Sequence, residues 1–179
     1  MARYQKQRTQ YPMGTVSSGT MREEDLIPDF CCRLSQLARQ SGIRPAKARR
    51  AHLALVKKIE RRIEDEREFI DGTADDDLES LFDALHEYSA LYSYFGAHPG
   101  DGADYGWWLL ENWDKDFRTL DTITTQHDCG VGFGDSLKVS DLADVPSWYR
   151  GEVAVVNDHG NVTLYIKTCR TLRAVWSVV

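Results

Sequence analysis

The sequence lacks any apolar run that approaches the roughly 20 residues needed for a membrane-spanning helix. Its first residues, MARYQKQRTQYPMG, are basic and polar, and they lack the apolar core of a signal peptide. These two absences argue against secretion and against a membrane partner. We therefore expect a cytoplasmic protein.

Cysteine is scarce, and its spacing is uninformative for metal binding. The four cysteines comprise an adjacent pair, Cys31 and Cys32, and two isolated residues, Cys129 and Cys169. A zinc knuckle or a disulfide framework requires other spacings, such as C-x-x-C, and none is present. The sequence therefore predicts reduced thiols and no cofactor.

Charge is abundant but unevenly distributed along the 179 residues, whose overall composition is ordinary for a globular domain. Through Arg62 there are 14 Lys or Arg against 5 Asp or Glu, and from Ile63 onward there are 8 against 23. The local net charges of +9 and −15 sum to the overall −6. Such asymmetry indicates either a partner-binding face or attraction between the two halves of the fold.

Helical periodicity dominates the first half. Residues 1–18 show none and are predicted to be a mobile tail or an early edge strand. A capping-box pattern at Thr20 and Glu23 predicts a short turn, followed by a helix with Pro28 in its first turn. A second helix is expected from Pro45 to about Ile70, and a third begins near Asp75, with the remaining helical pattern ending by residue 91.

Strands dominate the remainder. The clearest signal is the hairpin turn Asn157-Asp158-His159-Gly160 between two β-prone runs. Residues 111–136 form an irregular excursion. Short connections predict antiparallel pairing. The expected fold class is α+β, with about three N-terminal helices packed on a C-terminal antiparallel sheet of four to five strands. Residues 19–179 would form a single domain, helical over 20–91 and mainly strand and loop over 92–179.

One candidate site is the segment HPGDGAD, a long loop in which His98, Asp101 and Asp104 could face a common centre. Imidazole and carboxylate groups suit a metal site or general acid–base chemistry. This reading predicts a small metal-dependent hydrolase. The alternative is a hairpin loop whose aspartates bond to their own backbone amides.

A second candidate is the basic helix. Its cations are Arg44, Lys47, Arg49, Arg50, Lys57, Lys58, Arg61 and Arg62. Five of them, Arg49, Arg50, Lys57, Lys58 and Arg61, are the predicted nucleic-acid contacts, because Lys and Arg at this density neutralise phosphates. Acidic residues follow at once from Glu60, and the alternative is an ion-paired, solvated helix face.

A third candidate is a protein-binding surface formed by the acidic helix and an aromatic run. Its predicted contacts are Asp75, Asp76, Asp77, Glu79, Trp107 and Trp108. Carboxylates on one helix face complement a cationic groove, and tryptophan is favoured at binding hot spots. The alternatives are a solvated helix start and a tryptophan-filled core.

The strings FGAHPGDGADYGWW, GTVSSGTMREEDLIPDF and LKVSDLADVPSWYRGEVAVVNDHGNVTLY resemble a family of small uncharacterised proteins encoded by bacteriophages and mobile elements. The resemblance covers most of the chain, apart from the long basic helix and residues 119–134. It implies an accessory protein of the host cytoplasm that binds and modulates a host macromolecule, for example as an anti-defence inhibitor, with a host protein as the expected partner and nucleic acid as the other candidate. The leading prediction is therefore non-enzymatic host binding, with the hydrolase and the nucleic-acid-binding protein as alternatives.

Overall fold

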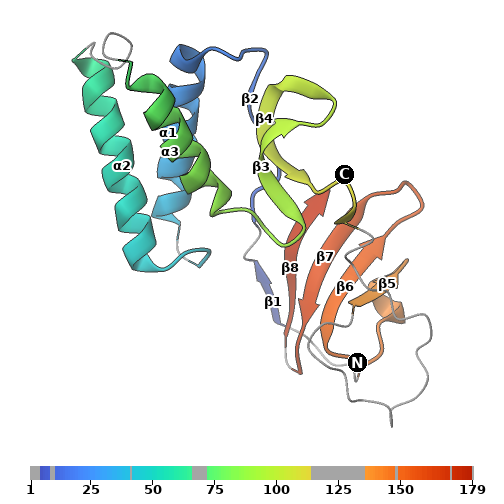
Figure 1. The fold of residues 1–179 in the computed structure, drawn as a ribbon. Helices are drawn as coiled ribbons and strands as arrows, with labels where there is room; N and C mark the ends of the chain where they lie inside the picture. Colours follow the sequence, from blue (N-terminus) through green and yellow to red (C-terminus); the bar gives the residue numbers. More distant parts are fainter. Residues whose placement is uncertain are drawn as a thin grey trace. The chain divides into compact units, whose positions relative to one another are not determined.

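The computed structural model describes residues 5–8, 11–40, 42–65, 72–113, 136–147, 149–169 and 171–178. The chain divides into two compact units, one of residues Pro12–Leu109 and the other of Met1–Tyr11 together with Leu110–Val179 (Figure 1). The single domain expected over residues 19–179 stays a prediction.

The first unit consists of three helices and a small sheet. Its elements are β2 (Gly14–Ser18), α1 (Glu23–Arg39), α2 (Ala46–Glu64), α3 (Ala74–His86), β3 (Ser93–His98) and β4 (Asp101–Leu109). The sheet is antiparallel in the order β2-β4-β3. Helix α1 packs against both α2 and α3, and α1 and α3 contact the sheet. Figure 1 shows α2 on the far side of α1 and α3 from this sheet, so α2 is the outer layer of the unit.

Aromatic side chains fill the core of this unit. The ring of Phe30 on α1 lies 5.2 Å from Phe82 on α3 and 5.2 Å from Phe95 on β3. Phe95 in turn contacts Trp107 on β4 at 4.8 Å. Edge-to-face contacts of this kind add to the stabilisation from apolar burial. They join α1 and α3 to the sheet, and they leave α2 to pack from outside.

Helix α1 begins earlier than predicted. It is continuous from Glu23, so Pro28 lies inside the helix rather than in its first turn. The Thr20 hydroxyl accepts from the Arg22 amide at 3.1 Å and donates to Asp25 at 2.7 Å. Thr20 therefore bonds to Asp25 instead of forming the predicted capping box with Glu23.

The second unit is a five-stranded sheet in the order β1-β8-β7-β6-β5. Its strands are β1 (Gln5–Arg8), β5 (Ser136–Val139), β6 (Gly151–Val156), β7 (Val162–Lys167) and β8 (Thr171–Val178), with the short helix η1 (Leu142–Asp144) after β5. The predicted antiparallel hairpin is confirmed, and the Asn157 side chain accepts from the amides of His159 and Asn161 in its turn.

The α+β class is confirmed, while the arrangement of its elements is only partly as predicted. Strands β1 and β2 lie before the helices and at the edges of their sheets, which agrees with the early edge strand, one of the two alternatives predicted for residues 1–18. The strands belong to two sheets rather than to the single sheet predicted. The pairs β1–β8 and β5–β6 are parallel, which contradicts the all-antiparallel prediction. Most of the 111–136 excursion lies outside the described residues. In the described part of the chain, no helix is long and apolar enough to cross a membrane.

Candidate functional site

Helix α2 is amphipathic, and its two faces serve different purposes. His52, Val56 and Ile59 are buried against the rest of the unit. The helix follows Pro45, whose fixed φ suits a helix start, and it spans Ala46–Glu64. The predicted extension over 66–70 lies outside the described residues.

Two cations of α2 point inward and stabilise the fold. Arg49 donates from Nη1 to the Ala38 carbonyl at 3.4 Å and to the Gln40 carbonyl at 3.2 Å, at the end of α1. Arg62 forms an ion pair with Asp77 on α3. Arg49 was a predicted nucleic-acid contact, but these hydrogen bonds place its guanidinium against α1 instead.

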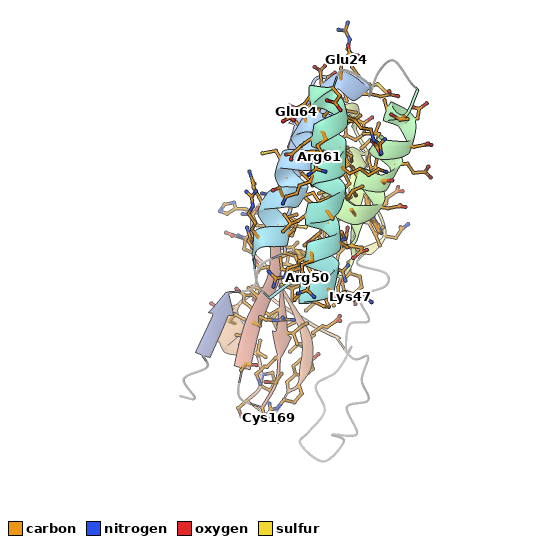
Figure 2. All side chains as sticks on the ribbon, turned by 90° about the vertical axis from the view of Figure 1, so that its left-hand side faces the viewer. Glu24, Lys47, Arg50, Arg61, Glu64 and Cys169 are labelled. Carbon is orange, nitrogen blue, oxygen red and sulfur yellow. The ribbon has the colours of Figure 1, made fainter. Side chains whose placement is uncertain are left out.

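The other four predicted contacts, together with Lys47, form an outward surface. We call it the α2 basic face, and it comprises Lys47, Arg50, Lys57, Lys58 and Arg61, all of them exposed. With 3.6 residues per turn, these positions fall within about a third of the helix circumference, opposite the buried side chains. Figure 2 looks onto this side of the helix and shows Lys47 and Arg50 near one end of α2 and Arg61 farther along it.

Intrahelical ion pairing does not account for this face. Among the residues that the structure describes, the side chains of Lys47, Arg50, Lys57 and Arg61 make no ion pair or hydrogen bond. Lys58 is the exception, with Nζ 4.0 Å from the Asp77 carboxylate, yet its side chain remains 63% exposed. Glu64 and Asp65 are exposed at the end of the helix (Figure 2 labels Glu64), so the positive surface ends there.

The predicted acidic surface is only partly on the outside. Asp75, Asp76 and Glu79 are exposed, but Asp77 is 2% exposed and is held by Arg62. The pKa of Glu23 is raised, mainly by a side-chain hydrogen bond with Asp75 and to a smaller extent by burial. Asp75 and Asp77, at the start of α3, therefore interact with residues of their own unit.

The two predicted tryptophan anchors differ in burial, Trp107 being buried and Trp108 half-buried. Trp107 is 0% exposed, and the Arg33 guanidinium lies 5.5 Å from its ring. The indole N–H of Trp108 donates to the Gly96 carbonyl at 2.9 Å, and its ring contacts His98 at 4.6 Å. Trp107 is enclosed in the core, so it cannot anchor a partner on the surface.

The HPGDGAD segment is a tight hairpin between β3 and β4 rather than a long loop. The imidazole of His98 accepts from the Gly100 amide at 3.0 Å, and Asp101 accepts from the Ala103 amide at 3.0 Å. Asp104 accepts from the Thr15 hydroxyl at 3.2 Å. The three side chains thus have separate partners, two within the hairpin and one on β2. The described residues contain no group of three or more His, Cys, Asp or Glu side chains arranged to hold a metal ion.

A buried polar network ties α2 to the turn after α3. His52 Nδ1 lies 3.0 Å from the Tyr88 hydroxyl, and its Nε2 lies 3.6 Å from the Glu87 carboxylate. Burial raises the pKa of Tyr88. Arg44 Nε also approaches Glu87, at 3.8 Å. These contacts fix the orientation of α2, and therefore the direction in which its basic face points.

In the second unit, Lys167 is a buried cation that the sequence pattern did not single out. Its Nζ donates to the carbonyls of Pro146, Ser147 and Tyr149 at 2.7 to 3.0 Å. Burial, and then the neighbouring Arg150 guanidinium, lower the pKa of Lys167 to about 8. Its position at the end of a β-prone run gave no sign of these acceptors, because they belong to a distant turn.

No protein-family model, curated protein or solved structure matches this chain. The resemblance to phage proteins therefore remains a prediction. Among the three surfaces predicted from the sequence, the cationic one keeps four of its five predicted contacts exposed, and Arg49 is the exception. The position of Lys47 within this face could have been found from helical spacing alone, since Lys47 and Arg50 are three residues apart.

Proposed function

We propose that this protein is a non-enzymatic nucleic-acid-binding protein and that the α2 basic face contacts the phosphates. The observation that carries the proposal is the exposure of Lys47, Arg50, Lys57 and Arg61 without ionic partners among the described residues. The helix backbone fixes the spacing of these cations, and each phosphate that they neutralise releases condensed counterions.

The length of the face supports a phosphate backbone as the ligand. Lys47 and Arg61 are fourteen residues apart, which corresponds to about 21 Å along a helix. That length covers about six base pairs of a duplex at about 3.4 Å per pair. A single small anion would contact one or two of these side chains and leave the others without a ligand.

The overall charge of −6 does not oppose this proposal, because the charge is segregated. Acidic residues such as Glu64, Asp65 and Asp76 carry the negative charge at other positions of the helical unit. Repulsion from them would restrict a polyanion to the α2 basic face. The expected origin in a phage or mobile element, and the modulation of a host protein, stay predictions.

The test is a matched pair of charge-neutralising variants. Arg50→Gln/Arg61→Gln removes two charges from the face, and Arg22→Gln/Lys138→Gln removes two exposed charges elsewhere. Both variants change the net charge from −6 to −8. Binding to a fluorescein-labelled DNA duplex of about 20 base pairs is measured by anisotropy at low salt. The first variant should lose affinity about tenfold or more, and the second should bind like the wild type; equal losses would count against the face.

A further inference from the structure

The arrangement of charge within the α2 basic face points to a more specific ligand. We infer that α2 docks in the major groove of B-form DNA, with its cations on the phosphates of both strands. This inference rests on the proposed function and specifies the nucleic acid and the docking mode.

The face has a small, uncharged centre. Ala54 is exposed at this centre, and Ala51 is exposed at the margin of the face, beyond Lys58. At 3.6 residues per turn, Lys47, Ala54 and Arg61 fall on one line along the helix. Alanine side chains project least from a helix, apart from glycine, so the backbone can approach a ligand most closely at this point.

The cations surround that centre on both sides. Helical spacing places Arg50 and Lys57 on one side of the central line and Lys58 on the other. Lys47 and Arg61 lie at the two ends of the line. A helix face with a short side chain at its centre and cations at its margins is complementary to a DNA groove. The base edges form the floor of the groove, opposite the centre of the face, and the phosphates line its walls, opposite the cations.

The dimensions select the major groove of B-form DNA. A helix with its side chains is about 10–12 Å across, and this groove is about 12 Å wide. The major groove of A-form RNA is deep and narrow, so a helix does not enter it. The minor groove of B-form DNA, at about 6 Å, is also too narrow.

The position of α2 in its unit permits this approach. The helix is the outer layer of its unit, with α1 packed against it. Ala54 is exposed, and helical spacing places it opposite the buried residues His52, Val56 and Ile59. The face also carries no side-chain amide or hydroxyl group, since its members are alanine, lysine and arginine. Amide pairing with adenine is therefore missing. Because the cations bind phosphates in this docking mode, rather than the guanine edges that Arg and Lys can also read, we expect little preference among DNA sequences.

The experiment compares two duplexes and two leucine variants. A DNA duplex and an RNA duplex of the same sequence, each of about 20 base pairs, are titrated at about 50 mM salt, where phosphate contacts are strong. Ala54→Leu places a bulky, uncharged side chain at the centre of the face. Ala143→Leu makes the same change at an exposed position in the other unit. Circular dichroism at the helical band verifies that both variants retain their helices.

The wild type should bind DNA at least tenfold more tightly than RNA. Ala54→Leu should lose about tenfold on DNA and little on RNA, and Ala143→Leu should change neither affinity. Equal affinity for the two duplexes, or full DNA binding by Ala54→Leu, would overturn groove docking and leave phosphate binding intact. Failure to bind either duplex would overturn the proposed function as well.

Discussion

Arg62 on α2 and Asp77 on α3 form an ion pair in which the carboxylate is almost wholly enclosed, with its side chain 3% exposed against 22% for the arginine. Lys58 also approaches the same carboxylate, at 4.0 Å. The pair joins the helix that carries the basic face to a helix that packs on the sheet. It also explains why Asp77 is not part of the surface that its acidic neighbours form.

We predict that Arg62→Met destabilises the helical unit by about 3 kcal/mol, because it leaves a buried carboxylate without its main counterion. Arg62→Met/Asp77→Leu should recover part of this loss, because neither charge remains. Urea unfolding followed by circular dichroism at the helical band measures both free energies of unfolding. A double variant at least as unstable as Arg62→Met would contradict the charge-based explanation.

Gly106 on β4 is expected to tolerate no side chain. A Cβ atom at this position would lie 2.2 Å from the carbonyl oxygen of Gly14 on β2, and this backbone cannot move away without breaking the strand pairing. Gly106→Ala should therefore cost about 3 kcal/mol or more of unfolding free energy.

Gly102 on the same strand provides the control. A Cβ atom there would have no atom within 4 Å, and Gly102→Ala should stay within about 0.5 kcal/mol of the wild type. Similar losses for the two variants would mean that β2 does not pack on β4 as closely as described.

Lys167 predicts a specific pH dependence of stability. Its pKa is about 8 in the folded protein, lowered by burial and by Arg150, against 10.5 for an ordinary lysine. Between these values the unfolded chain binds more protons than the folded one, so this residue makes unfolding less favourable as the pH rises. We therefore subtract the free energy of unfolding of Lys167→Met from that of the wild type at each pH. This difference should be larger at pH 10 than at pH 7. A difference that does not change with pH would argue against the depressed pKa.

Negative charge at the end of α2 should weaken nucleic-acid binding. Glu64→Gln/Asp65→Asn removes two exposed carboxylates next to the α2 basic face and should raise DNA affinity about threefold at low salt. Asp158→Asn/Glu111→Gln removes two exposed carboxylates from the other unit and serves as the control. If the control variant gains as much affinity, net charge rather than the local face determines binding.

The sequence predicted those features that depend on local pattern. The apolar spacing of Leu81 and Leu85 correctly indicated the buried side of α3, and the turn residues after Val156 correctly indicated the β6–β7 hairpin. It did not predict that β2 pairs with β4, since that pairing joins residues about ninety positions apart and leaves no local pattern.

In the candidate site, too, features that depend on local sequence pattern were predictable and features that depend on packing between distant elements were not. The density of cations on α2 was evident from the sequence, and helical spacing separates Arg50 on the outside from Arg49 on the inside. The burial of Asp77 was not predictable in this way, because its partner Arg62 lies on another helix. Likewise, the enclosure of Trp107 follows from the packing of α1 on the sheet, which no spacing within β4 reveals.

The salt dependence of DNA binding tests the central claim most directly. Each phosphate neutralised by a cation contributes about −0.9 to the slope of log K against log salt concentration. The five cations of the α2 basic face predict a slope of about −4.5 for the wild type and about −2.7 for Arg50→Gln/Arg61→Gln. The Arg22→Gln/Lys138→Gln control should retain the wild-type slope. Slopes that are the same for all three proteins would contradict phosphate binding by α2.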